Sequence, residues 1–263
     1  MTVTSVGTME ASLRARRDAG AKLLVPYVTG GIDGWVAVVE AVAAAGADAV
    51  EIGIPFSDPM MDGSTIQEAS ALALARGATP AGILAEIADT QIRVPLAVMT
   101  YYNIPFRAGL QAFARDLASS GIAGAIVPDL PLEELDEWEA AAASGEIEAI
   151  LLAAPTTDDE RLVRICERSR GWVYAVGLMG VTGERSGLAA SATLMGKRLK
   201  AVTDKPVLIG VGVSTPEQAV EASTYADGVI VGSALVRRLL EGEGPDGAAR
   251  LVAELRAGLD SAF

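Results

Sequence analysis

The sequence predicts a single (β/α)8 barrel, a TIM barrel, preceded by an extra N-terminal helix. Short apolar segments alternate along the chain with longer segments of helical period, and no low-complexity linker interrupts the alternation. The apolar segments are continuous rather than alternating in polarity, as in parallel strands that are buried on both faces. A chain of 263 residues, 51% of them hydrophobic, can build such a barrel as one domain spanning residues 1–263.

Eight segments have the length and composition of buried strands. In chain order they are "KLLVPYV" (22–28), "DAVEIGI" (48–54), "VPLAVMTY" (94–101), "AGAIVPD" (123–129), "EAILLAA" (148–154), "GWVYAVG" (171–177), "KPVLIGV" (205–211) and "ADGVIVG" (226–232). One helix followed by eight strand–helix units is the pattern of this barrel.

The predicted helices carry their own start and stop signals. Apart from the first helix, over 9–19, the clearest helices span 34–46, 64–77, 110–121 and 132–145. Thr79 before Pro80 predicts an N-cap and a first-turn proline, and Ser214 with Glu217 predicts a capping box. Glycines that fit the position just after a helix are Gly46, Gly77 and Gly121.

Composition excludes several classes of function. A formal net charge of −13 argues against nucleic-acid partners, whose phosphates require Lys and Arg. The absence of histidine excludes Ser-His-Asp and Cys-His catalysis and the common histidine metal sites, so carboxylates are the natural proton carriers. Cys166, within a helical pattern, is interpreted as a small core residue. No apolar run reaches membrane-spanning length and the first residues lack a signal-peptide pattern, so we expect a cytoplasmic protein that does not bind membranes.

The stretch "EIGIPFSDPMMDGSTIQ" (51–67) places two carboxylates where this fold has its active site. Glu51 falls near the end of the second strand and Asp62 in the following loop, at the carboxyl ends of the strands. Because an unpaired buried carboxylate is costly, a catalytic role is favoured. Two structural alternatives remain open: Glu51 is neutralised by an arginine, or Asp62 caps the helix that begins near Ser64.

Three glycine-bearing turns follow the last three strands and indicate a phosphate site. They are "GVTGERSG" (180–187), "GVGVST" (210–215) and "VGSAL" (231–235). Glycines let backbone N–H groups approach a ligand, and a helix that begins at Ser233 directs its positive end at a dianion. Phosphate commonly binds after strands seven and eight of this fold.

Six motifs together resemble the alpha subunits of tryptophan synthase. They are "EIGIPFSDPMMDGSTIQ", "MTYYNIPF", "VPDLPLEE", "YAVGLMGVTG", "GVGVSTPEQ" and "ADGVIVGSALV", in the family's order over nearly the whole chain. The resemblance implies a barrel that cleaves indole-3-glycerol phosphate to indole and glyceraldehyde 3-phosphate without cofactor or metal. It also implies a beta subunit as partner, in an alpha2-beta2 assembly that takes part in tryptophan biosynthesis.

The resemblance also assigns residues. Glu51 and Asp62 match the catalytic carboxylates, and Tyr174 matches the active-site tyrosine. Thr182 matches the threonine of a mobile loop that closes over the substrate. The phosphate-binding positions are Gly183, Gly212, Gly232 and Ser233. Positions lining the indole pocket and its surroundings are Tyr27, Tyr101 and Asp129.

Different environments would let the two carboxyls do different work. Partial desolvation should raise the pKa of Glu51 so that it can deliver and accept protons, while Asp62 accepts a hydrogen bond from the indole N–H. Apolar residues in the loops after the second and third strands predict a protein contact: Met60, Met61, Ile104, Pro105 and Phe106. The alternatives to a tryptophan synthase subunit are a stand-alone lyase that releases indole, a non-catalytic homologue that binds or activates a partner, and another phosphate-binding barrel.

Overall fold

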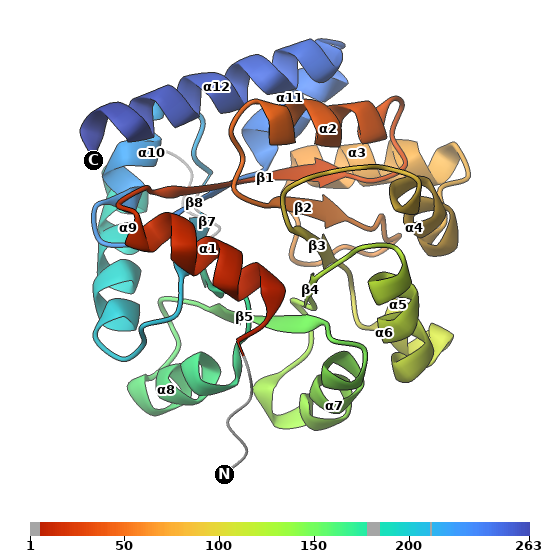
Figure 1. Cartoon of the computed structure of the whole chain (residues 1–263), viewed down its shortest axis with the longest axis horizontal. Coiled ribbons are helices and arrows are strands. Elements are labelled where there is room, and N and C mark those ends of the chain that lie inside the picture. Colours follow the sequence, from red (N-terminus) through yellow and green to blue (C-terminus); the bar gives the residue numbers. More distant parts are fainter. Residues whose placement is uncertain (1–5, 178–184, 211) are drawn as a thin grey trace.

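The computed structural model describes residues 6–177, 185–210 and 212–263. Eight parallel strands form a closed barrel in chain order, with β8 pairing back onto β1 (Figure 1). The strands are β1 (Leu23–Thr29), β2 (Val50–Gly53), β3 (Leu96–Met99), β4 (Gly124–Ile126), β5 (Glu148–Ala153), β6 (Val173–Val176), β7 (Val207–Gly210) and β8 (Gly228–Val231). The predicted fold is therefore confirmed.

Apart from α1, which lies across one end of the barrel, the helices are arranged around its outer face (Figure 1). In chain order they are α1 (Thr8–Asp18), α2 (Trp35–Ala44), α3 (Ser64–Ala75), α4 (Pro80–Ala88), α5 (Asn103–Ala108), α6 (Leu110–Ser119), the 3-10 turn η1 (Leu132–Glu134), α7 (Asp136–Ser144), α8 (Asp159–Arg168), α9 (Arg185–Lys200), α10 (Pro216–Ser223), α11 (Ser233–Leu240) and α12 (Gly244–Ala262). The segment 132–145, predicted as one helix, is divided into η1 and α7. The segment around Pro105, expected as a loop, forms α5, because a proline in the first helical turn removes no intrahelical hydrogen bond.

Most of the predicted caps are present. The Thr79 hydroxyl accepts the Gly82 N–H at 3.1 Å. The predicted capping box of Ser214 with Glu217 is wrong by one residue: Pro216 opens α10, so Thr215 is its N-cap and accepts the N–H of Gln218 at 3.3 Å. The three helix-ending glycines have φ of 109° at Gly46, 87° at Gly77 and 77° at Gly121, a conformation that costs glycine little.

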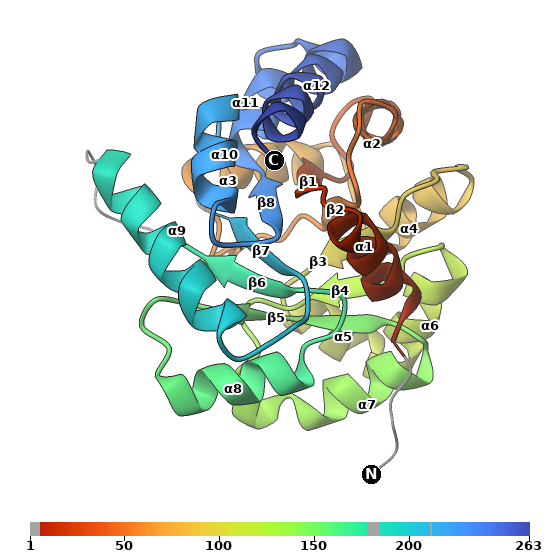
Figure 2. The same cartoon turned by 60° about the vertical axis from the view of Figure 1, so that its left-hand side comes forward.

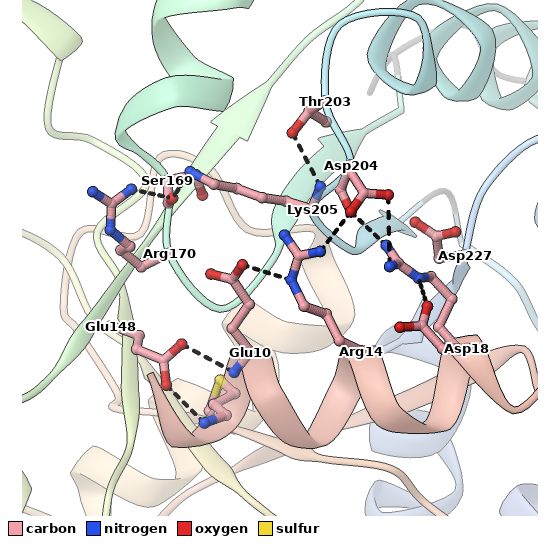
Figure 3. Close-up of polar contacts among 12 residues, drawn as sticks. Glu10, Arg14, Asp18, Glu148, Ser169, Arg170, Thr203, Asp204, Lys205 and Asp227 are labelled. Carbon is pink, nitrogen blue, oxygen red and sulfur yellow. Dashed lines mark hydrogen bonds and ion pairs between the residues drawn. The ribbon is translucent and has the colours of Figure 1, made fainter. Parts of the chain in front are cut away.

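Helix α1 closes the amino-terminal end of the barrel. Met9 and Leu13 pack in one buried cluster with the strand residues Ile126 and Ile150 and with Trp172, which precedes β6. The Glu148 carboxylate, at the start of β5, accepts the N–H of Met9 at 2.7 Å and of Glu10 at 3.0 Å (Figure 3). This carboxylate satisfies two amides that the helix leaves unpaired at its N-terminus. In the described part of the chain, α1 therefore fills the amino-terminal end of the barrel.

Helix α12 completes the outer ring, lying beside α10, α11 and α2 (Figure 2). Its Arg256 donates to the Lys22 carbonyl at 2.7 Å and approaches the Asp48 carboxylate at 3.3 Å, which joins the end of the chain to β1 and β2. Cys166 is buried on α8, as expected of a small core residue. Within the described ranges no single helix is long and apolar enough to cross a membrane, although the bent pair α3 and α4 meets the length and composition criteria together.

Candidate active site

Glu51 lies inside the barrel on β2. Its Cα is in register with Tyr27 on β1 and Ala97 on β3, and its side chain is fully buried. Neither carboxylate oxygen has a hydrogen-bond partner among the described residues. The alternative that an arginine neutralises Glu51 is therefore wrong for this part of the chain.

The environment of Glu51 favours its neutral form. Burial, and secondarily the negative charge of Asp62, raise the pKa of Glu51 to about 8. A carboxyl with this pKa holds its proton at neutral pH and can donate it to a substrate. The same group accepts a proton readily once it has given one away.

Asp62 lies in the loop between β2 and α3 and is half-buried. Gly63 is the N-cap residue of α3 and no side chain caps this helix, so the alternative that Asp62 is a helix cap is wrong. Burial raises the pKa of Asp62 to about 6, although a hydrogen bond with Tyr101 opposes the increase. Asp62 therefore ionises before Glu51, and at neutral pH the pair consists of one carboxylate and one carboxylic acid.

Two tyrosines from non-adjacent strands of the barrel face these carboxyls. Tyr27 lies on β1 and Tyr174 on β6, and burial raises the pKa of both phenols well above 10. Their rings occupy space left by glycines: a Cβ on Gly53 would lie 2.7 Å from Cε2 of Tyr27, and a Cβ on Gly210 would lie 2.7 Å from Cε1 of Tyr174. Neither glycine is predicted from the sequence to make room for a tyrosine, although each is the next-to-last residue of a predicted strand segment.

Tyr101 follows β3 and reaches the loop that carries Asp62. Its ring stacks on Phe56 with centroids 5.1 Å apart, and its hydroxyl accepts the Met61 N–H at 2.8 Å. Asp129, after β4, is exposed and accepts the Tyr102 N–H at 2.8 Å. Met61 and Asp129 also line a cavity of about 310 Å³ that runs along the ends of β4 and β5. Asp129 thus joins two loops of the barrel mouth.

The expected phosphate positions lie at the ends of β7 and β8. Gly212 has a φ of 74°, and a Cβ there would meet nothing within 4 Å. Gly232 is the N-cap residue of α11 and Ser233 begins this helix, whose first-turn amides favour an anion. A Cβ on Gly232 would lie 3.6 Å from Cβ of Tyr27, so this turn lies beside the tyrosine whose phenol faces the carboxyl pair. Thr182 and Gly183 lie outside the described residues.

The predicted apolar surface at the barrel mouth is smaller than expected. Met60, Met61 and Phe106 are exposed, with Met60 at 85%. Pro105 is buried and Ile104 is partly buried, because α5 turns these two positions toward the protein. Across the described ranges no cluster of three or more Cys, Asp or Glu could hold a metal ion.

The sequence matches the family Tryptophan synthase alpha chain over residues 13–260. It is 46% identical to the tryptophan synthase alpha chain of Gloeobacter violaceus over 87% of this chain and 84% of that one. It is 42% identical to the alpha chain of Thermobifida fusca over 97% of this chain and 98% of that one. Tryptophan synthase from M. tuberculosis has a similar structure, with a TM-score of 0.88 and 38% identity over 97% of this chain and 99% of that chain.

Proposed function

The chain belongs to the tryptophan synthase alpha chain family, and from this premise we propose which of its residues perform the family's reaction. It is a lyase of tryptophan biosynthesis that cleaves indole-3-glycerol phosphate to indole and glyceraldehyde 3-phosphate. The observation that carries the proposed site is the buried carboxyl of Glu51, whose oxygens have no partner in the described part of the chain, beside Asp62.

Glu51 is the acid and base of this site. Its carboxyl gives a proton to indole C3, which converts the ring into an electron sink with positive charge on its nitrogen. The carboxylate that results takes the proton of the glyceryl C3′ hydroxyl. The bond between C3 and C3′ then breaks, its electron pair restores the aromatic indole, and C3′ becomes the aldehyde carbon. The carboxyl of Glu51 ends the cycle protonated, as it began.

Asp62 stabilises the charge that this protonation creates. As the ionised member of the pair, it accepts a hydrogen bond from the indole N–H, which strengthens as positive charge develops on the ring. Tyr27, Tyr101 and Tyr174 surround the same space and hold the substrate, and Asp129 orders the loop beside them. The support for these roles is the convergence of the side chains at the carboxyl end of the barrel.

The phosphate of the substrate binds at the turns after β7 and β8, through Gly212, Gly232 and Ser233. The support is the positive φ of Gly212 and the N-terminus of α11 beside Tyr27. Thr182 and Gly183 match the family's loop positions and would complete the site from the segment between β6 and α9.

A beta subunit is the partner, since the family pairs with one, and an alpha2-beta2 assembly follows for this chain. We place the contact at the side chains of Met60 and Met61, in the loop after β2, and of Phe106, on α5, because exposed large apolar side chains can mark protein interfaces. Met60 and Met61 adjoin Asp62 in sequence, so contact there would also act on the catalytic loop.

The test is cleavage of indole-3-glycerol phosphate by the purified chain, with indole and glyceraldehyde 3-phosphate measured separately. We expect both products in equal amounts, and release faster by orders of magnitude when the cognate beta subunit is added. Products without any response to the beta subunit would indicate a stand-alone lyase. No product under either condition would contradict the proposed site.

A further inference from the structure

Tyr101 contacts both the backbone and the side chain of the catalytic loop. Its hydroxyl accepts the N–H of Met61 at 2.8 Å, and the interaction of this hydroxyl with the adjacent Asp62 carboxyl lowers the pKa of Asp62. Its ring stacks on Phe56, where the loop leaves β2, with centroids 5.1 Å apart. One side chain at the end of β3 therefore joins three points of the loop.

We infer that Tyr101 is a positioning residue that acts on the reaction through Asp62, beyond any contact its ring makes with the substrate. A tyrosine hydroxyl has one hydrogen and can accept with its lone pairs. Because the lone pair meets the Met61 N–H, the hydrogen is available to Asp62. Such a bond is stronger to a carboxylate than to a neutral acid, so Tyr101 both orients Asp62 and favours its ionised form. This inference depends on the role proposed for Asp62.

A second restraint on the loop acts differently. The Gln67 side-chain amide, on α3, donates to the main-chain oxygen of Asp62 at 2.8 Å and approaches that of Pro59 at 3.5 Å. It holds the loop backbone and makes no hydrogen bond to the carboxylate. Tyr101 is thus the side chain through which the end of β3 acts on the carboxylate itself.

Neighbouring charges do not obscure the effect of the Tyr101 hydroxyl on the ionisation of Asp62. Among the described residues, the other ionisable groups facing Asp62 or Tyr101 are Glu51, Tyr27, Tyr174 and Asp129. Burial keeps Glu51 and the two other tyrosines neutral over the range in which Asp62 titrates, since its pKa is about 6 and that of Glu51 is about 8. Asp129 faces the phenol of Tyr101 from the loop after β4. Loss of the Tyr101 hydroxyl should therefore raise the pKa of Asp62.

The experiment compares Tyr101→Phe with Tyr102→Phe in the full chain. Tyr101→Phe keeps the ring on Phe56 and removes only the hydroxyl. We expect its kcat for indole-3-glycerol phosphate to fall about tenfold or more with little change in KM, and the acid limb of its pH profile to move upward. Tyr102 is the adjacent phenol, and its backbone bond to Asp129 does not need its hydroxyl, so Tyr102→Phe should behave as the parent.

A second measurement separates this inference from the proposed function. The Asp62 carboxyl is titrated by carbon NMR in the parent and in both variants, which requires no activity. We expect a higher pKa only in Tyr101→Phe. A parent-like titration and pH profile in Tyr101→Phe would overturn the inference. Absence of cleavage in the parent would overturn the proposed function, and the titration would still decide whether Tyr101 acts on Asp62.

Discussion

Tyr27 fills the space beside Gly53 on the neighbouring strand. A Cβ on Gly53 would lie 2.7 Å from ring carbon Cε2 of Tyr27 and nearer still to its hydroxyl oxygen. The register that pairs Tyr27 with Glu51 brings the phenol alongside β2 and next to the carboxyl pair. Glycine is required at position 53 because the tyrosine occupies the space of a side chain.

Gly53→Ala should destabilise the fold by about 1–3 kcal/mol, because the added methyl group overpacks the site. Urea denaturation checks this. The matched comparison is the same change in a Tyr27→Leu background, in which the shorter side chain leaves room for the methyl group. If the two substitutions were additive, the packing relationship would be refuted.

Glu51→Gln should lower turnover of indole-3-glycerol phosphate about 100-fold or more, since the amide keeps the shape of the side chain but cannot transfer the proton. Steady-state kinetics measure the loss, and circular dichroism confirms that the fold is retained. Turnover close to that of the parent would exclude Glu51 as the acid and base.

Stability should depend on pH through Glu51. Its pKa in the folded protein is about 8 and its ordinary value is 4.5, so between these values the folded state binds more protons than the unfolded state. Stability therefore falls as pH rises through this window. Glu51→Gln removes the effect, and its stability relative to the parent should increase by a few kcal/mol (order of magnitude) between about pH 5 and pH 8.

Urea denaturation across this pH range measures the difference. Asp62→Asn provides the comparison, because the pKa of Asp62 rises only from 3.8 to about 6 and its window lies lower. A constant difference between the parent and Glu51→Gln from pH 5 to pH 8 would mean that the carboxyl of Glu51 titrates normally in the folded protein.

Gly212→Asp should weaken binding of the substrate phosphate strongly, because it places a like charge beside a dianion. Gly212→Ala is the matched control: it carries the same strain at a φ of 74° without the charge, and there is open space for its methyl group. Calorimetry with glycerol phosphate analogues measures both. Equal affinities for the two variants would show that the phosphate does not bind at this turn.

Occupancy of the site should strengthen association with the beta subunit, because Met60 and Met61 precede Asp62 directly in the same loop. Coupling between sites is typically 1–3 kcal/mol, so indolepropanol phosphate should tighten association roughly 5- to 150-fold. Titrations with and without the analogue measure it. Met60→Ala should weaken association, whereas Val163→Ala, at an exposed apolar position on α8, should not. Equal dissociation constants with and without the analogue would reject coupling through this loop.

Local patterns in the sequence were sufficient to predict the barrel and the position of Glu51 near the end of a strand. Continuous apolar runs predict buried parallel strands, and the glycines after helices and the Thr79 cap depend on residues within a few positions of one another. Because parallel strands of a barrel all end at one rim, the placement of Glu51 on a strand and Asp62 in the next loop already brought them to a common site.

Contacts between residues that are distant in the sequence depend on closure of the barrel and could not be predicted from local patterns. Strand register brings Tyr27 against Gly53, and the same closure sets Tyr101 on Met61 and Glu148 at the N-terminus of α1, 139 residues from Met9. No local pattern encodes such pairs, since each depends on which strands become neighbours and where their side chains point. Burial likewise separated the pKa values of Glu51 and Asp62, because desolvation follows from the packing of the whole barrel around each carboxyl.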